Sequence, residues 1–189
     1  MKISQLGEIL SDEFAIKVAG GSANPEEPAI EKIKDSDIAG VVFDSREVRE
    51  GYVFVAIKGV KTDGHLFIES AVEKGASAVI CETPEVYVKY RQVYTDVLFL
   101  CVRDARRALA VVSAYFYGRA CDKLKIVGIT GTKGKTSTSF MLASILKAAG
   151  IKTGIIGTNG AYFEDFYEEL GHSTPESRDL HRLFAKMLS

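Results

Sequence analysis

The stretch KIVGITGTKGKTSTSFML, Lys125 to Leu142, decides how this sequence is interpreted. A continuous apolar run leads into a glycine-rich turn, and a helical pattern follows that turn. We predict a buried strand over Leu124–Thr130 and a helix that ends near Ala149, before Gly150. Backbone N–H groups at the start of a helix, together with the helix dipole, favour an anion. The stretch is therefore predicted to bind phosphate.

The predicted phosphate site lies on the loop between the strand and the helix. Gly131 and Gly134 allow the tight turns that bring backbone N–H groups close to a ligand. The Lys135 ammonium suits the outer phosphates of a nucleotide, and the Thr136 hydroxyl suits the magnesium ion that bridges them. The common template GxxxxGK[ST] would place its first glycine on Ile129, so this loop is the shorter string GxxGKT. Its flanking strand and helix favour a nucleotide-binding loop over an ordinary glycine-rich turn.

Upstream of this loop, segments rich in β-branched residues alternate with helical ones. A short amphipathic helix is expected near the N-terminus, with Ser4 as a plausible cap, and two more are expected after Asp63 and after Asp104, because aspartate is a favourable N-cap. The segment from Thr83 to Tyr94 is ambiguous. Strands are expected at residues 38–45, 52–59, 76–82 and 96–102. The alternation predicts an α/β fold with two parts, a small domain over residues 1–103 and the start of a P-loop, Rossmann-like domain over residues 104–189.

Two more elements are expected after the loop. Lys152–Thr158 is predicted to be a second strand, parallel to Leu124–Thr130. The segment STPESRDLHRLFAKMLS begins like a helix, with Ser173 or Thr174 as its cap and Pro175 in the first turn. No carboxylate follows a further buried strand, although a P-loop enzyme needs one to help hold magnesium. We therefore expect these 189 residues to be the N-terminal part of a longer protein.

Composition argues against several classes of protein. The 24 basic and 25 acidic residues are balanced, so no excess of positive charge indicates nucleic-acid binding. No apolar run reaches the roughly 18 residues of a membrane span, and the N-terminus lacks the apolar core of a signal peptide. The cysteines and histidines are too scattered for a zinc site. We expect the cysteines to be buried, reduced thiols and His65 to be solvated or structural.

Three separated motifs resemble the Mur ligase family. GITGTKGKTSTS resembles the ATP loop of these ligases and of the related folylpolyglutamate synthetases. FDSREVREGYVFVAIKGVKTDGHLFIESAVEKGASAVICE, from Phe43 to Glu82, is similar to the N-terminal domain of the branch that adds the third residue of the peptidoglycan peptide. STPES, which begins at Ser173, resembles a Thr-Thr-Pro-Glu-Ser segment of that branch. The likeness spans most of Phe43–Leu188.

The resemblance implies an ATP-dependent ligase of cell-wall synthesis that acts in the cytoplasm as a monomer. Such ligases phosphorylate the carboxylate of UDP-MurNAc-L-Ala-D-Glu, and the amine of meso-diaminopimelate or L-lysine then attacks the acyl phosphate. ATP and Mg²⁺ are the implied cofactors, and no nucleic acid or membrane partner is implied. The amino-acid pocket and the modified lysine of the family would lie downstream. We therefore expect no ligase activity from these residues alone.

The resemblance also implies roles for particular residues. Lys135 and Thr136 are the implied catalytic pair, with Thr136 as a magnesium ligand. ATP contacts are implied for Gly131, Thr132, Lys133, Gly134, Lys135, Thr136 and Ser137. Substrate contacts are implied for Phe43, Ser45, Val60, Lys61, Thr62, Ser173 and Thr174. Plainer interpretations stay open, because Asp44-Ser45-Arg46 also fits a strand-ending turn and Ser173 or Thr174 also fits a helix cap.

Two other functions remain open from the sequence. One is another ligase of the superfamily, either a different Mur ligase or a folylpolyglutamate synthetase. The Phe43–Glu82 block argues against the folate enzymes, which generally lack that domain. The other is a non-catalytic module that binds a UDP-muramyl compound, although the intact Lys135-Thr136 pair argues against a dead ATP site.

Overall fold

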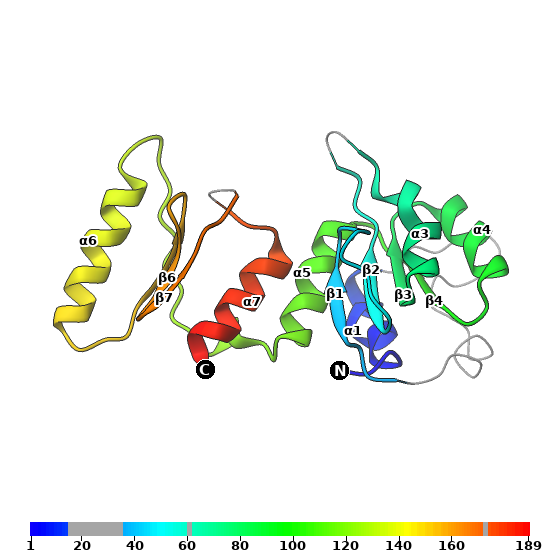
Figure 1. Cartoon of the computed structure of the whole chain (residues 1–189), viewed down its shortest axis with the longest axis horizontal. Helices are drawn as coiled ribbons and strands as arrows, with labels where there is room; N and C mark the ends of the chain where they lie inside the picture. Colours follow the sequence, from blue (N-terminus) through cyan, green and yellow to red (C-terminus); the bar gives the residue numbers. More distant parts are fainter. Residues whose placement is uncertain (15–35, 60–61, 172–173) are drawn as a thin grey trace. The chain divides into compact units, whose positions relative to one another are not determined.

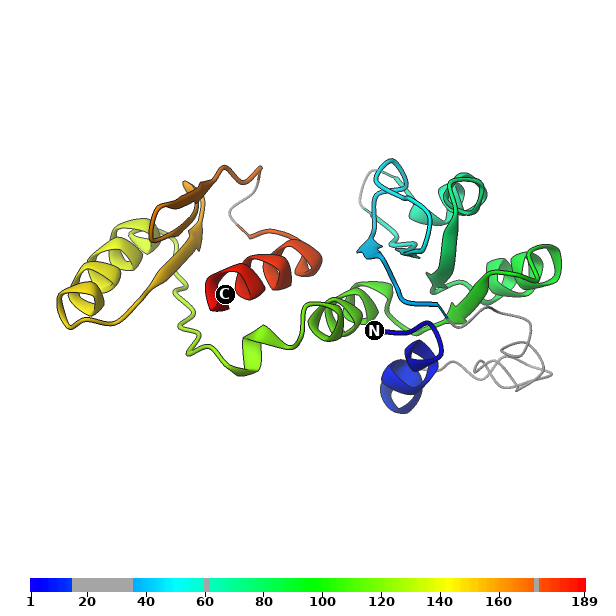
Figure 2. The same cartoon turned by 60° about the horizontal axis from the view of Figure 1, so that its bottom comes forward.

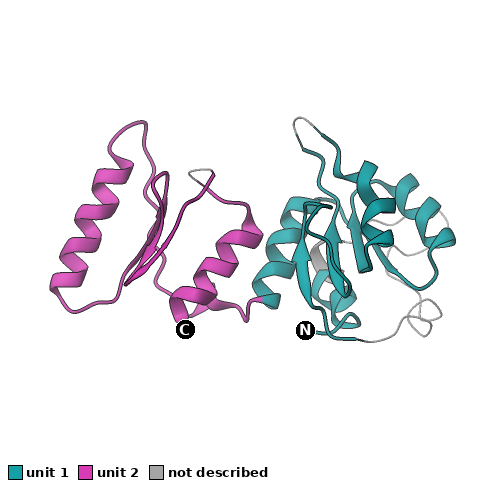
Figure 3. Cartoon of the chain, viewed as in Figure 1, with its two compact units in different colours: residues 1–116 teal, residues 117–189 magenta. Residues whose placement is uncertain are grey.

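The computed structural model describes residues 1–14, 36–59, 62–171 and 174–189. It divides into two compact units, Met1–Phe116 and Tyr117–Ser189, which are coloured separately in Figure 3. Each unit has its own sheet. Within the four described ranges, no helix is long and apolar enough to cross a membrane.

Unit 1 is built on a four-stranded parallel sheet with the strand order β1-β2-β3-β4 (Figure 1). The strands are β1 (Gly40–Val42), β2 (Tyr52–Val55), β3 (Ala76–Cys81) and β4 (Leu98–Cys101). Each lies inside the range that the sequence predicts for it. Because all four strands are parallel, their carboxyl ends lie along one edge of the sheet, where open α/β sheets bind ligands.

Five helical segments among the described residues accompany this sheet. They are α1 (Gln5–Phe14), the 3₁₀ helix η1 (Gly64–Phe67), α3 (Ile68–Glu73), α4 (Pro84–Val93) and α5 (Ala105–Phe116). The ambiguous segment is thus a helix, with Pro84 in its first turn, where the lack of an N–H does no harm. Both predicted aspartate caps are confirmed. Asp63 Oδ1 accepts a hydrogen bond from His65 N at 3.0 Å, and Asp104 Oδ1 accepts one from Arg107 N at 2.9 Å.

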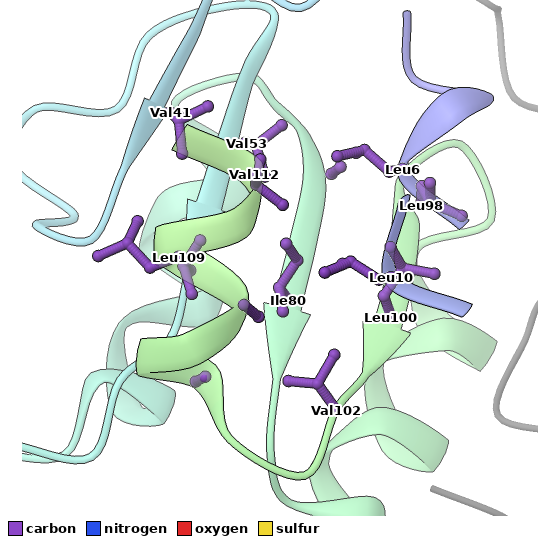
Figure 4. Packing of buried hydrophobic residues seen from close by; sticks show 14 of the residues in the cluster. Leu6, Leu10, Val41, Val53, Ile80, Leu98, Leu100, Val102, Leu109 and Val112 are labelled. Carbon is purple, nitrogen blue, oxygen red and sulfur yellow. The ribbon is translucent and has the colours of Figure 1, made fainter. Parts of the chain in front are cut away.

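Alternate residues of the parallel sheet face two hydrophobic cores. On β2, Val53 and Val55 face the core that also contains Leu6 of α1 and Leu109 of α5, whereas Phe54 faces the other core. Figure 4 shows Leu6, Val53 and Leu109 in the first core. The second core lies under α3 and α4. Helices therefore cover both faces, as a parallel sheet requires.

Helix α5 belongs to unit 1. Its residues Leu109 and Val112 are fully buried in the first core. We expected the division of the chain between residues 103 and 104, in front of this helix, but the compact units divide between Phe116 and Tyr117. The apolar face of α5 is visible in the sequence, but the sheet that buries this face is not.

Unit 2 contains a three-stranded antiparallel sheet with the order β5-β6-β7. Figures 1 and 2 show this sheet between helices α6 and α7. Helix α6 ends as predicted, because Gly150 follows it with a left-handed φ of 76°. The elements of unit 2 are the 3₁₀ helix η2 (Ala120–Asp122), α6 (Lys135–Ala148), β5 (Gly154–Gly157), β6 (Gly160–Phe163), β7 (Phe166–Glu168) and α7 (Ser177–Leu188).

Two strand predictions for unit 2 are wrong. Residues 124–130 form no strand, and Ile126 and Val127 are 55% and 65% exposed. Strand β5 pairs with β6 in an antiparallel hairpin that closes at Gly157 and Gly160, and not in parallel with residues 124–130. A strand needs a hydrogen-bonded neighbour, and among the described residues none pairs with this apolar run. The apolar run was therefore not enough to predict a strand at residues 124–130.

Candidate functional site

The first group of predicted site residues lies at the carboxyl edge of the parallel sheet. Phe43 and Ser45 follow β1, and Thr62 follows the neighbouring strand β2. Ser45 is buried, Phe43 packs partly against the first core, and Thr62 is exposed. Val60 and Lys61 lie outside the described residues. The structure thus brings two segments of the predicted substrate site to adjacent strand ends.

Charged side chains hold the turn that follows β1. Arg46 Nη2 lies 2.6 Å from Asp44 Oδ2, and Arg46 N donates to Asp44 Oδ1 at 2.9 Å. The hydrogen bond from the Arg46 side chain lowers the pKa of Asp44 from its ordinary value. Lys74 Nζ donates to the Ser45 carbonyl oxygen at 2.8 Å and so ties this turn to the end of α3. The interpretation of Asp44-Ser45-Arg46 as a strand-ending turn is confirmed, and a ligand contact there stays a prediction.

The second group of predicted site residues surrounds the start of α6. Gly134 is the N-cap of this helix with a left-handed φ of 80°, and Gly131 has a φ of 154°. Lys135 Nζ donates to the Gly131 carbonyl oxygen at 2.6 Å, so its ammonium lies over the loop. The helix dipole and this ammonium place positive charge at one point. Three more predicted ATP-contact residues are exposed: Thr132 and Lys133 on the loop, and Ser137 in the first turn of α6.

A cavity of about 310 Å³ opens beside the start of α6. Lys135 and Thr136 line it from the helix, Thr174 lines it from the segment before α7, and Asn159 lines it from the turn between β5 and β6. Residues from two separate sequence motifs therefore share one cavity in unit 2. Apolar side chains of α6 and β5 line much of it as well, and its Lys135 ammonium and hydroxyls suit an anionic group.

The segment before α7 differs from its prediction. Helix α7 begins at Ser177, and its N-cap is Glu176, which has an extended backbone with a φ of −61° and a ψ of 156°. Because the chain becomes helical only after Glu176, Thr174 is not the helix cap. Thr174 instead lines the cavity, whereas Ser173 lies outside the described residues.

The sequence pattern gave no site role to most of the residues that line this cavity, and Asn159 and Tyr162 are two examples. Asn159 and Tyr162 both line it, and the Tyr162 hydroxyl donates to the Asn159 carbonyl oxygen at 2.6 Å. Neither belongs to one of the motifs considered above. They reach the cavity because β6 folds back along β5, a pairing that the sequence reading did not expect.

Comparisons with known proteins agree with this division of the chain. Residues 37–117 match the Mur ligase family, catalytic domain, and residues 129–189 match the Mur ligase middle domain. The chain is 43% identical over 152 residues to the UDP-N-acetylmuramoyl-L-alanyl-D-glutamate--2,6-diaminopimelate ligase of Clostridium tetani, a match that covers 80% of this chain and 31% of the relative. The protein of the same name from Chlorobium phaeobacteroides is 40% identical over 184 residues, which are 97% of this chain and 33% of the relative.

Solved structures give the same likeness. A structure of UDP-N-acetylmuramoyl-L-alanyl-D-glutamate--2,6-diaminopimelate ligase matches with a TM-score of 0.60 at 25% identity, over 81% of this chain and 30% of that one. A parallel sheet in unit 1, followed by a glycine loop that opens a helix in unit 2, makes this an α/β protein of two units. The chain belongs to the Mur ligase family. It spans about a third of the length of these curated relatives.

Proposed function

We propose that this chain is the uridine-nucleotide-binding and ATP-binding part of a ligase that adds 2,6-diaminopimelate to UDP-MurNAc-L-Ala-D-Glu. The names of relatives that are 40% and 43% identical support this assignment. The observation that carries it is the cavity beside α6, which Lys135, Thr136 and Thr174 all line. This cavity joins a phosphate-binding motif to a segment that we assign to the muramyl peptide. We further propose that the ligase acts as a monomer in the cytoplasm.

Unit 1 is proposed to hold the UDP group at the carboxyl edge of its sheet. Phe43 and Ser45 come to this edge from β1, and Thr62 comes to it from β2. Val60 and Lys61 precede Thr62 in the chain and are proposed to contribute to the same site. The position of these residues supports the assignment, because parallel sheets bind ligands beyond the carboxyl ends of their strands.

The start of α6 fits the triphosphate of ATP and its Mg²⁺. The left-handed Gly134 begins the helix, and no atom of the described chain lies within 4 Å of the place that a Cβ would occupy there. Phosphate oxygens can therefore approach the backbone N–H groups closely. In addition to Gly131 and Gly134, the loop residues proposed to contact ATP are Thr132, Lys133, Lys135, Thr136 and Ser137.

The chemistry of this site is proposed to be positioning and charge neutralisation. Bound ATP supplies the phosphoryl group that activates the substrate carboxylate. Lys135 would move from the Gly131 carbonyl to the outer phosphates and offset their charge, and the Thr136 hydroxyl would ligate Mg²⁺. Thr174, which shares the cavity, would orient the muramyl peptide towards these phosphates.

Titration calorimetry of the 189-residue chain tests this proposal. The ligands are UDP-MurNAc-L-Ala-D-Glu, UDP and Mg-ATP. We expect all three to bind, and the muramyl dipeptide to bind more tightly than UDP because it offers additional groups for recognition. Failure of Mg-ATP to bind would contradict the role of the α6 loop. Equal affinity for UDP and the muramyl dipeptide would contradict the assignment of the muramyl peptide to this chain.

A further inference from the structure

A buried histidine connects the loop after β2 to the end of the neighbouring strand β3. His65 is 6% exposed. Its Nδ1 lies 2.6 Å from Asp63 Oδ1, and its Nε2 accepts a hydrogen bond from Glu82 N at 3.1 Å. A neutral ring with its proton on Nδ1 satisfies both contacts, because it donates to Asp63 and accepts from Glu82. Both ring nitrogens of His65 are therefore engaged.

Asp63 closes the loop that carries Thr62. Lys58 and Asp63 form an isolated antiparallel bridge, and Gly59 N donates to the Thr62 carbonyl oxygen at 3.0 Å. The two ends of the loop therefore lie side by side. Immediately after the loop, Gly64 N donates to the Ile57 carbonyl oxygen at 2.9 Å. The position of Thr62 thus depends on how Asp63 is held.

His65 is the residue that holds the Asp63 carboxylate. The backbone N of His65 donates to Asp63 Oδ1 at 3.0 Å, in addition to the contact with its ring. Burial opposes the ionisation of Asp63, but the hydrogen bonds from the His65 backbone and ring outweigh it and lower its pKa. An ionised carboxylate can only accept hydrogen bonds, so His65 supplies the donors that it needs.

Glu82 extends the same set of contacts to a third element. While its backbone N donates to His65, its side-chain Oε2 accepts a hydrogen bond from Ala105 N at 3.1 Å. Ala105 is the first residue of α5, where a carboxylate also interacts favourably with the helix dipole. The loop after β2, the end of β3 and the start of α5 are therefore linked through His65 and Glu82.

We infer that Asp63, His65 and Glu82 form a polar brace that positions Thr62 for binding a uridine nucleotide. The inference rests on the proposed function of the carboxyl edge of unit 1. His65 is a positioning residue, because it acts through Asp63. If the role of His65 were only structural, its replacement would change the stability of unit 1. The affinity of the folded protein for the uridine nucleotide would stay the same.

Three variants of His65 separate its two contacts. In His65→Asn, the side-chain amide nitrogen replaces Nδ1 and donates to Asp63. In His65→Gln, the side chain is longer, so its amide oxygen replaces Nε2 and accepts the hydrogen bond from the Glu82 backbone N. His65→Phe fills the space but makes neither contact. Calorimetry on the 189-residue chain gives the Kd for UDP-MurNAc-L-Ala-D-Glu and for Mg-ATP.

We expect His65→Phe to raise the Kd for the UDP compound about tenfold, the effect of losing a buried hydrogen bond. His65→Asn, which keeps the donor to Asp63, should raise it about twofold at most, and His65→Gln should lie between the two. The Kd for Mg-ATP should stay the same in all three. Val112→Ala is the matched control, because it removes packing from the core of unit 1 without altering the brace. Folded Val112→Ala should bind the UDP compound and Mg-ATP with unchanged Kd values.

Amide hydrogen exchange provides a readout that needs no ligand. The Glu82 amide should exchange faster in His65→Phe and His65→Asn, because both lose its acceptor, and should stay protected in Val112→Ala. If His65→Phe does not fold, the contrast between His65→Asn and His65→Gln carries both measurements. If the Glu82 amide exchanged at an unchanged rate in His65→Phe and His65→Asn, the inference that His65 holds Glu82 would be overturned.

The outcomes distinguish this inference from the proposed function. If the UDP compound binds and His65→Phe weakens it no more than Val112→Ala does, the positioning role is overturned and the proposed site stands. The positioning role is also overturned if His65→Asn binds the UDP compound as weakly as His65→Phe does. If the unaltered chain binds Mg-ATP but no uridine nucleotide, the proposed site in unit 1 fails and the positioning role fails with it.

Discussion

Arg182 of α7 donates two hydrogen bonds to the carboxylate of Glu168 in β7, from Nη1 to Oε2 at 3.0 Å and from Nη2 to Oε1. The two side chains are 33% and 30% exposed. The hydrogen bond from Arg182 lowers the pKa of Glu168 and outweighs the opposing effect of burial. Because a two-pronged contact between arginine and a carboxylate is stronger than an ordinary surface ion pair, this one ties α7 to the small sheet.

Replacing Glu168 by Gln should lower the free energy of unfolding of unit 2 by about 1 kcal/mol at neutral pH. The pKa of Glu168 is lower in the folded state than its ordinary value of 4.5. The contribution of its charge is therefore present above that value and is lost as the pH falls through the lower, folded pKa. Urea denaturation from neutral pH to about pH 3 measures this, and the difference between the two proteins should shrink in acid. A difference that stays constant with pH would contradict the argument.

Replacing Lys135 by Ala should weaken the binding of Mg-ATP by about ten- to a hundredfold, because a charge-assisted contact with phosphate is lost. The fold should be unaffected, since Lys135 is exposed and its hydrogen bond to the Gly131 carbonyl lies at the surface. Calorimetry gives the affinity. Lys133→Ala is the matched control: it removes an equal charge from the same loop, but its side chain does not line the cavity, so the loss should be severalfold smaller. If both replacements weakened Mg-ATP binding equally, the net charge of the loop, and not the position of Lys135, would determine the affinity.

Replacing Gly134 by Ala should cost about 1–2 kcal/mol, because the φ of 80° lies in the left-handed region that residues with a Cβ disfavour. Packing is not the cause, since no atom of the described residues, apart from the chain neighbours of Gly134, lies within 4 Å of the added Cβ. Gly128→Ala is the control in the same segment. Gly128 also has open space around it, and its φ is not positive, so its replacement should be nearly neutral. Thermal unfolding compares the two, and similar shifts in the midpoint would contradict the backbone argument.

Replacing Ser113 by Ala should stabilise unit 1 by up to about 1 kcal/mol. Ser113 is 0% exposed on α5, and its Oγ has no hydrogen-bond partner among the residues that the structure describes. Removing a buried hydroxyl that makes no hydrogen bond ends its desolvation cost at little loss of packing. Denaturant unfolding measures the change. Ser144→Ala, at an exposed helix position where Oγ donates to the Phe140 carbonyl, should shift stability by less than about 0.5 kcal/mol. If Ser113→Ala were less stable than the unaltered protein, the Ser113 hydroxyl would have to make a stabilising hydrogen bond.

Features with local signals were predictable from the sequence. The Asp63 and Asp104 caps are confirmed, because a cap depends on residues within one turn of the helix. A tight turn at Gly134 before α6 was expected from the glycine-rich loop, and the left-handed φ of Gly134 agrees with it. The structural role of His65 was one of two alternatives, and its partners Asp63 and Glu82 could not be identified.

The candidate site was predictable only in part. The motif of Lys135 and Thr136 indicated a phosphate-binding loop, and both residues line the cavity beside it. Asn159 and Tyr162 gave no such indication, because they reach the cavity through the pairing of β5 with β6. The contact of Lys74 with the Ser45 carbonyl was equally hidden, since it joins segments far apart in the chain.

The sequence by itself determined the α/β alternation of unit 1, the Asp63 and Asp104 caps and the glycine loop before α6, since each depends on neighbouring residues and on the freedom of single backbone bonds. The tertiary structure alone decided that α5 covers the first sheet, that β5 pairs with β6, and that His65 joins Asp63 to Glu82. These outcomes depend on buried area and hydrogen bonds between segments distant in the chain. Local patterns do not specify which distant segments will meet.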